Sequence, residues 1–403
     1  MASRFVPGNL CEVQAHAPYG IMNPGRDMMW TRKRLVRNID FTLLGLVALI
    51  MVVGLVVIGS ATQAQQGNTH YVTMQGIWIL LGLSAILIVL TINYTEFYRL
   101  SHLLYVLNVL MLLAVLLVSE PIQGSQRWLV FGPVRIQPSE IAKIFVILTL
   151  AAHLARKREL KSWFDLVPAF IHVSLPMVLI LRQPDLGTAM VLLGILVGML
   201  FIAGFPARRL ALLVFGGLAL AVGSIWAHLR FGLWLPLKDY QIDRLLVFID
   251  PEGVNPLTTG YHLRQSKIAI GSGGALGKGL FQGTQNNLNF LPEQHTDFIF
   301  SVVGEELGFV GACAILLVYL LILWRGMVIA ASAKDRYGTL VAAGVVTMIA
   351  FQVFVNVGMT VGIMPITGLP LPFVSYGGSS LLTNAVGVGL LLNIYLRRHK
   401  IRF

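Results

Sequence analysis

Residues 41–61 read FTLLGLVALIMVVGLVVIGSA and contain no charged side chain. An α-helix of about 20 apolar residues crosses the ~30 Å hydrocarbon core of a bilayer, so this run is predicted to span a membrane. The whole chain has the same character: of its 403 residues, 56% are hydrophobic and only 12% are charged. One water-soluble core of this length could not bury so many apolar residues. The bilayer is therefore expected to solvate most of the chain.

Comparable runs recur along the sequence, which predicts an all-α integral membrane protein of about ten transmembrane helices. Residues 37–403 are expected to form one membrane domain, and residues 1–36 a cytoplasmic tail that is disordered in part. The predicted spans are 41–61, 71–92, 102–119, 138–155, 165–182, 186–204, 210–229, 299–323, 339–361 and 380–396.

The positions of Lys and Arg predict the orientation of these spans. Cytoplasmic connections carry an excess of both residues, and one set of alternate connections here holds nearly all of them. We therefore place both termini in the cytoplasm. The short outward connections hold only Arg127, Arg135 and Arg182. This topology, together with anionic lipid, accounts for most of the net charge of +12, and no nucleic acid is needed to explain it.

Two outward segments are too unusual to be simple turns. Residues 230–296, between the seventh and eighth spans, mix apolar runs with charges, and a structureless loop of that length is uncommon. Residues 362–379, between the ninth and tenth spans, are apolar but contain Pro365, Pro370 and Pro372, which oppose a regular helix. We interpret this second segment as a re-entrant loop beside a watery cavity. An interfacial linker is the alternative.

Charged residues at membrane depth are candidates for function. Glu140 and Lys143 lie three residues apart and can pair on one helix face, either as a structural pair or as lining of a substrate cavity. Asp185 follows Pro184 at an expected helix start, where helix capping explains it about as well as function does.

A third cluster, Pro292-Glu293-Gln294-His295-Thr296-Asp297, ends the long outward loop. Asp297 has the position of a simple helix cap. A carboxylate at the membrane surface beside basic groups is also well placed to act as a general base. Glu305 and Glu306 follow in the next span, and since neighbours point about 100° apart, at least one is expected to bond to glycine-rich neighbours or to be protonated.

Several familiar motifs are absent. The segment from Gly271 to Gly279 resembles a phosphate-binding loop, but Ser272 and Gly279 occupy positions where a Walker A motif needs Gly and Ser or Thr. The sequence contains no HExxH pattern, so it gives no indication of a zinc hydrolase. Cys11 and Cys313, in the tail and in a span, are not expected to meet in a disulfide.

Five stretches closely resemble the SEDS proteins of shape, elongation, division and sporulation, and the likeness runs from about residue 37 to the C-terminus. The sequence Gly368-Leu369-Pro370-Leu371-Pro372 and the short C-terminal tail are more similar to RodA than to FtsW. The stretches are Gln126-Arg127-Trp128, Gln137-Pro138-Ser139-Glu140, Gln183-Pro184-Asp185-Leu186-Gly187-Thr188, 260–307, and Pro372-Phe373-Val374-Ser375-Tyr376-Gly377-Gly378-Ser379.

This resemblance implies a peptidoglycan glycosyltransferase that polymerises lipid II on the outer face of the bacterial cytoplasmic (inner) membrane during cell elongation. It also implies a class B penicillin-binding transpeptidase and other elongation-complex membrane proteins as partners. The catalytic aspartate of the family falls on Asp297, its paired Glu and Lys on Glu140 and Lys143, and its third membrane carboxylate on Asp185.

The chemistry of such a transfer suggests further residues. A sugar hydroxyl needs a base, here Asp297, and the departing diphosphate needs cations. We assign Arg127, Lys267 and Lys278 to the diphosphate and place His295 among the substrate-binding residues. A bound Mg²⁺ would share this work, although no metal-ligand set is evident. A flippase for the lipid-linked precursor and a non-enzymatic elongation scaffold are the alternatives.

Overall fold

The computed structural model describes residues 39–63, 68–119, 127–131, 134–157, 160, 162–232, 234, 241–242, 244, 246–247, 259–288 and 290–398. The predicted tail 1–36 lies outside these residues, as does much of the outward loop before residue 259. From Asp40 onward the chain forms one compact unit.

Within the described residues, the regular secondary structure of that unit is helical apart from one short hairpin. Strands β1 (Leu129–Phe131) and β2 (Val134–Ile136) pair antiparallel, with Val130 opposite Arg135. The helices are α2 (Phe41–Ala61), α3 (Asn68–Thr91), α4 (Tyr94–Arg99), α5 (Ser101–Val118), α6 (Pro138–Ala155), η1 (Trp163–Asp165), α7 (Val167–Arg182), α8 (Leu186–Ile202), α9 (Ala207–Phe231), α11 (Thr259–Gly273), α12 (Thr284–Asn287), α13 (Ile299–Glu306), α14 (Gly308–Ala331), α15 (Arg336–Val361) and α16 (Gly378–Leu396).

Within the described residues, 9 helices are long and apolar enough to cross a membrane. They match nine of the predicted spans. The remaining prediction, 186–204, corresponds to α8, an apolar helix of 17 residues that is shorter than the others. The prediction of a polytopic helical membrane protein is confirmed.

The prediction of one continuous helix over 299–323 is wrong. The chain forms α13, leaves the helical path at Leu307 and begins α14 at Gly308, whose φ of +67° lies in the left-handed region. A right-handed helix has φ near −63°, so it cannot pass through this residue.

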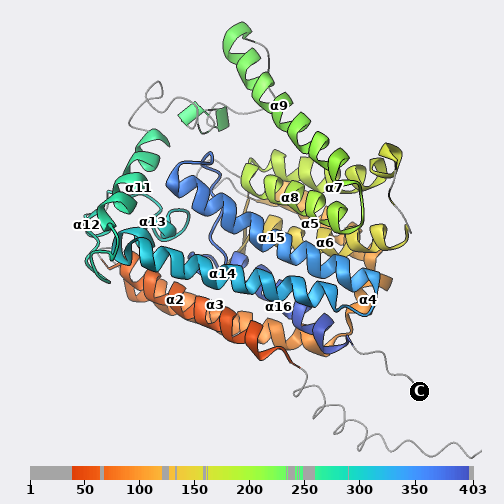
Figure 1. The fold of residues 1–403 in the computed structure, drawn as a ribbon, viewed down its shortest axis with the longest axis horizontal. Coiled ribbons are helices and arrows are strands. Elements are labelled where there is room, and N and C mark those ends of the chain that lie inside the picture. Colours follow the sequence, from red (N-terminus) through yellow and green to blue (C-terminus); the bar gives the residue numbers. More distant parts are fainter. Residues whose placement is uncertain are drawn as a thin grey trace, which may run out of the picture. The chain divides into compact units, whose positions relative to one another are not determined.

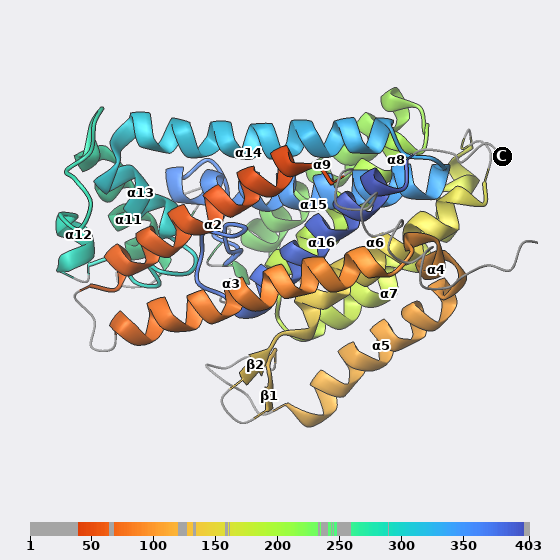
Figure 2. The same cartoon turned by 90° about the horizontal axis from the view of Figure 1, so that it is seen from below.

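The core of the bundle is formed by α6, α15 and α16, in each of which most residues are buried. Figures 1 and 2 show α14, α15, α16, α2 and α3 packed side by side, with α11, α12 and α13 at one end of the bundle and α4 at the other. Helix α9 projects away from the rest in Figure 1, and Leu210 is its one buried residue.

The proline-rich segment between α15 and α16 carries no helix or strand from Gly362 to Gly377. Gly362 ends α15 with φ +86°, and most residues from Ile366 to Ser375 are buried among the helices. Gly54 of α2 packs against it so closely that a Cβ there would lie 2.6 Å from the carbonyl oxygen of Phe373. The segment is thus packed against protein, and its re-entry into a membrane stays a prediction.

Candidate active site

A cavity of about 320 Å³ opens where α6, α8 and α16 begin, next to the residues that precede α13. Four of the connections predicted to face outward contribute to its wall. It is lined by Arg127, Trp128, Gln137, Glu140, Asp185, Thr188, Arg244, Glu293, Thr296, Asp297, Gly368, Leu369, Pro370, Tyr376, Gly377, Ser379 and Ser380.

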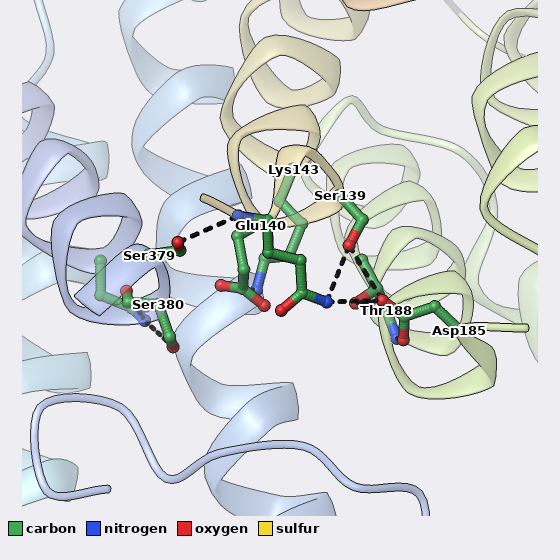
Figure 3. A network of polar contacts seen from close by, with 9 residues as sticks. Ser139, Glu140, Lys143, Asp185, Thr188, Ser379 and Ser380 are labelled. Carbon is green, nitrogen blue, oxygen red and sulfur yellow. Dashed lines mark hydrogen bonds and ion pairs between the residues drawn. The ribbon is translucent and has the colours of Figure 1, made fainter. Parts of the chain in front are cut away.

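Asp185 joins the beginnings of α6 and α8 (Figure 3). Its Oδ1 accepts the backbone N–H of Thr188 at 3.1 Å, which caps α8. Its Oδ2 accepts from Ser139 Oγ, Gln137 Nε2 and Thr188 Oγ1, each at 2.9 Å. These bonds fix the position of the carboxylate. Asp185 therefore holds the wall of the cavity in shape.

Glu140 and Lys143 form the ion pair that their spacing predicts. Lys143 Nζ lies 2.8 Å from Glu140 Oε2, and the two side chains are 0% and 3% exposed. Glu140 reaches the cavity, whereas Lys143 lies behind it on the same face of α6 (Figure 3). The cation therefore acts on the cavity through Glu140.

Arg127 comes from the segment that precedes β1. Its Nε donates to the carbonyl oxygen of Gln183 at 3.1 Å, and its Nη2 donates to that of Pro184. A guanidinium has five N–H donors, so these bonds orient the group and leave donors for a ligand. Arg244, from the long loop, supplies a second guanidinium to the same wall. Two cations thus face a cavity that also carries carboxylates.

Asp297 is held by its backbone. Asn356 of α15 donates to the carbonyl oxygen of Asp297 at 2.9 Å and to that of Leu369 at 2.7 Å. Gly368 approaches the carboxylate directly: it has φ +71°, and a Cβ there would lie 3.2 Å from Asp297 Oδ2. Helix α15 and the proline-rich segment therefore both determine the position of the Asp297 side chain.

The surroundings of Asp297 raise its pKa to about 6. Burial contributes most because it disfavours the charged form, and the nearby carboxylate of Glu293 adds to the rise. Arg244 and Arg127 act in the opposite direction. A carboxylate with a pKa near 6 is mostly ionised at neutral pH yet accepts a proton more readily than an ordinary aspartate, as a general base must.

His295 stands beside the cavity. Its ring lies 4.9 Å from that of Tyr71 and 5.8 Å from that of Tyr376, which lines the cavity. Burial lowers the pKa of His295, so the ring is neutral at pH 7. Its backbone carbonyl accepts the N–H of Tyr376 at 2.9 Å. The placement makes it a support for Tyr376.

The two predicted phosphate-binding lysines do not line this cavity. Lys278 lies 2.6 Å from Glu305 and donates to Ser272 and Thr284. The side chain of Lys267 lies against Gly362, at the end of α15. The structure gathers Arg127, Glu140, Asp185 and Asp297 and leaves the two lysines apart, because α11 and the segment after it pack on α13.

Sequence reasoning missed several lining residues. Ser379 and Ser380 lie in the first turn of α16, and Ser379 ends one of the stretches that resemble the SEDS proteins, so the resemblance was the available signal. Arg244 and Glu293 are charged residues of the long loop, and the sequence alone assigns neither a role. Which charged residue of an irregular loop faces a cavity depends on the path of that loop in the folded protein, and local sequence patterns do not give this path.

The cavity offers a Mg²⁺ ion some of the ligands that it would need. The described residues contain no group of three or more His, Cys, Asp or Glu side chains that could hold a metal ion. Mg²⁺ bound to substrate phosphates needs only one or two protein carboxylates. The carboxylate of Glu140 faces the cavity, so it fits a metal that arrives with a diphosphate.

The sequence model of the FtsW, RodA and SpoVE family, described as "Cell cycle protein", matches residues 36–400. The chain belongs to this family. Among the relatives of this SEDS protein, the peptidoglycan glycosyltransferase MrdB of Escherichia coli (strain K12) is 38% identical over 378 residues, which cover 93% of this chain and 97% of MrdB. The peptidoglycan glycosyltransferase RodA of Treponema pallidum is 36% identical, with 91% and 100% covered.

Solved structures agree with this membership. A chain of a peptidoglycan synthase complex, studied for the coordination of polymerisation and crosslinking, superposes with a TM-score of 0.76 at 33% identity and covers 90% of this SEDS protein and 99% of itself. The rod shape determining protein RodA of Thermus thermophilus gives a TM-score of 0.67 at 31% identity, with 90% and 98% covered.

Proposed function

We propose that this chain is a peptidoglycan glycosyltransferase that polymerises lipid II into glycan strands during cell elongation. The observation that carries the proposal is the cavity, which combines a carboxylate of raised pKa, Asp297, with the guanidinium groups of Arg127 and Arg244. Membership of the SEDS family and relatives named as peptidoglycan glycosyltransferases support it.

The reaction needs one proton acceptor and cations for one leaving group. The 4-hydroxyl oxygen of the acceptor sugar attacks the anomeric carbon of the donor and forms the new glycosidic bond. Its proton passes to Asp297. The bond from the anomeric carbon to the diphosphate breaks, and undecaprenyl diphosphate leaves with the electron pair. Arg127 and Arg244 stabilise the charge that grows on the diphosphate.

Glu140 and Asp185 shape the acceptor and donor sites in this proposal, with Lys143 fixing Glu140 and His295 supporting Tyr376. A Mg²⁺ bound with the diphosphate would neutralise part of its charge. Glu140 is the carboxylate that would hold it, since Asp185 already accepts four hydrogen bonds.

The location and partners belong to the same proposal. The excess of Lys and Arg in alternate connections supports an orientation with both termini in the cytoplasm and the cavity on the outer face of the cytoplasmic membrane. Lipid II is therefore used after it has crossed the membrane. A class B penicillin-binding transpeptidase is the proposed partner, supported by the likeness to a synthase complex that joins polymerisation with crosslinking, along with other elongation-complex membrane proteins.

The test uses purified full-length chain, with and without the transpeptidase, and labelled lipid II in detergent. We expect glycan strands that resist transpeptidase inhibitors and disappear on digestion with a muramidase. The same protein in sealed vesicles should not accelerate the transfer of labelled lipid II between leaflets. Translocation without glycan synthesis would indicate a flippase, and neither activity would indicate a scaffold; both results would overturn the proposal.

A further inference from the structure

The glycine-rich segment after α11 has no part in the cavity, yet it decides the path of the neighbouring helices. In a continuous helix the N–H of Phe309 would donate to the carbonyl of Glu305, four residues earlier, and that of Val310 to Glu306. Instead, Phe309 N–H donates to the carbonyl of Gly274 at 3.0 Å, and Val310 N–H to that of Ala275 at 3.1 Å.

The carbonyl groups that lose these partners are also taken up by the segment. The N–H of Lys278 donates to the carbonyl of Glu305, and that of Gly279 to the carbonyl of Glu306, both at 3.0 Å. Four hydrogen bonds with residues 274–279, which we name the glycine clasp, thus replace two of the bonds that would join α13 to α14 in a continuous helix. The break deprives the N–H groups of Phe309 and Val310 of their helical partners, and likewise the carbonyl groups of Glu305 and Glu306. The clasp supplies a hydrogen-bond partner to each of these four groups.

The close approach of the two backbones requires glycine. A Cβ at Gly277 would lie 2.1 Å from the carbonyl oxygen of Glu306, and one at Gly308 would lie 2.2 Å from the nitrogen of Gly277. Both glycines also have positive φ, +81° and +67°. The spacing that resembles a phosphate-binding loop in the sequence therefore serves contact between two protein backbones.

Side chains lock the clasp in place. Lys278 Nζ lies 2.6 Å from Glu305 Oε1 and 2.7 Å from both Ser272 Oγ and Thr284 Oγ1. An ammonium group has three N–H donors, and these three bonds use all of them. Lys278 therefore has no donor left for a phosphate. Glu305 is 1% exposed, so its charge depends on this partner.

The clasp is connected to Asp297 by one short helix. Helix α13 has eight residues and is about 12 Å long. Its N-cap is Phe298, directly after Asp297. A clasp that fixes the last residues of α13, Glu305 and Glu306, fixes the direction from which Asp297 enters the cavity. Without the clasp, residues 299–331 are free to join into a single helix, and the start of α13 moves.

We propose that the glycine clasp is a positioning device for the general base: it holds the break between α13 and α14 open so that Asp297 stands in the cavity. Gly277 and Lys278 are positioning residues that act through α13. This inference rests on the proposed function, because it assigns the clasp a purpose in the same reaction.

The experiment compares two alanine variants of the full-length chain with its transpeptidase partner and lipid II. Gly277→Ala places a methyl group against the Glu306 carbonyl. Gly271→Ala, on the neighbouring helix α11, is the matched control, because its Cβ would meet nothing within 4 Å. For Gly277→Ala we expect the turnover rate to fall about 10²-fold, as misplacement of a catalytic group by about 1 Å does. KM should change by less than about threefold, because the lining residues other than Asp297 keep their places.

Two further readouts separate positioning from general loss of structure. The acidic limb of the pH–rate profile of Gly277→Ala should move to lower pH, because Asp297 leaves the surroundings that raise its pKa. Amide hydrogen exchange should accelerate at Lys278 and Gly279, but not at Phe309 or Val310, which regain partners in a continuous helix. If Gly277→Ala does not fold, Lys278→Met replaces it, with Lys278→Arg expected to restore most of the turnover.

The outcomes distinguish the two proposals. A wild type that polymerises lipid II, together with a Gly277→Ala variant that equals Gly271→Ala in turnover and pH profile, would overturn the clasp alone. A rise in KM with unchanged turnover for Lys278→Met would also overturn it, since that result describes a substrate-binding lysine. A wild type without polymerase activity would overturn the proposed function, and the clasp's role in that reaction with it.

Discussion

At the scale of single residues, the environment of Asp297 makes the pH dependence of the reaction predictable. A base works only when ionised, so the rate should rise with pH and reach half its maximum near the pKa of about 6. Glu293→Gln removes one of the causes of the raised pKa, and the half-maximum should move to lower pH with the plateau largely retained. A pH–rate profile of both proteins between pH 4.5 and pH 8 checks this; coincident profiles would contradict it.

The same carboxylate should reduce stability at neutral pH. A pKa raised from 3.8 to about 6 means that the folded state binds the proton more tightly than the unfolded state does. The stability that this proton provides is complete below about pH 4 and is lost as pH rises through 6. The shift corresponds to at most about 3 kcal/mol. Asp297→Asn should therefore raise the midpoint of heat unfolding at pH 8 and leave it nearly unchanged at pH 4.

The buried pair of Glu140 and Lys143 gives a stability prediction that is independent of catalysis. Lys143→Met leaves a carboxylate unpaired in the bundle, which costs about 3 to 5 kcal/mol. The double variant Glu140→Gln, Lys143→Met removes both charges and should recover most of that loss. Heat unfolding in detergent measures both. A double variant as unstable as the single one would show that the pair is not the reason for the loss.

Residue chemistry was predictable where a local pattern carried it. The three-residue spacing of Glu140 and Lys143 predicted their pairing, and Pro184 before Asp185 predicted a capped helix start, which Asp185 forms. The assignment of Lys278 to a phosphate had no such basis, because its true partner, Glu305, lies 27 residues away across a tertiary contact. Arg244 in the cavity wall was unpredictable for the same reason.

At the scale of elements, helix α2 supports the proline-rich segment through one glycine. A Cβ at Gly54 would lie 2.6 Å from the Phe373 carbonyl oxygen, whereas one at Gly45 on the same helix meets nothing within 4 Å. Gly54→Ala should therefore destabilise the protein by about 1–3 kcal/mol through overpacking. It should also slow polymerisation, because the displaced segment carries Gly368 beside Asp297. Gly45→Ala is the control, and equal behaviour of the two variants would contradict this packing.

Hydrophobic runs predicted the helices well, because a membrane span needs little more than length and apolar composition. They could not predict the break at Leu307, since residues 299–323 are mostly apolar and contain no proline, and isolated glycines such as Gly304, Gly308 and Gly311 are tolerated inside helices. The break is maintained by hydrogen bonds from residues 274–279, a segment distant in sequence. The hydrophobic pattern of a segment indicates its local tendency to form a helix. It does not indicate tertiary hydrogen bonds from other segments that interrupt that helix.

At the scale of the whole molecule, the fold gathers polar residues from four connections of an apolar bundle into one cavity. That gathering accounts for the buried charges at the starts of α6 and α8, Glu140 and Asp185, which line the cavity. The family and the multi-span helical fold followed from the sequence. The sidedness of the cavity and the identity of its base remain predictions.

The measurement that tests the central claim most directly is the rate of lipid II polymerisation by the purified chain with its transpeptidase partner, compared with that of Asp297→Asn at equal folding and partner binding. Loss of a general base should lower the rate by about 10² to 10⁴-fold. The account predicts a fall in this range. An Asp297→Asn protein that polymerises lipid II at the wild-type rate would contradict it.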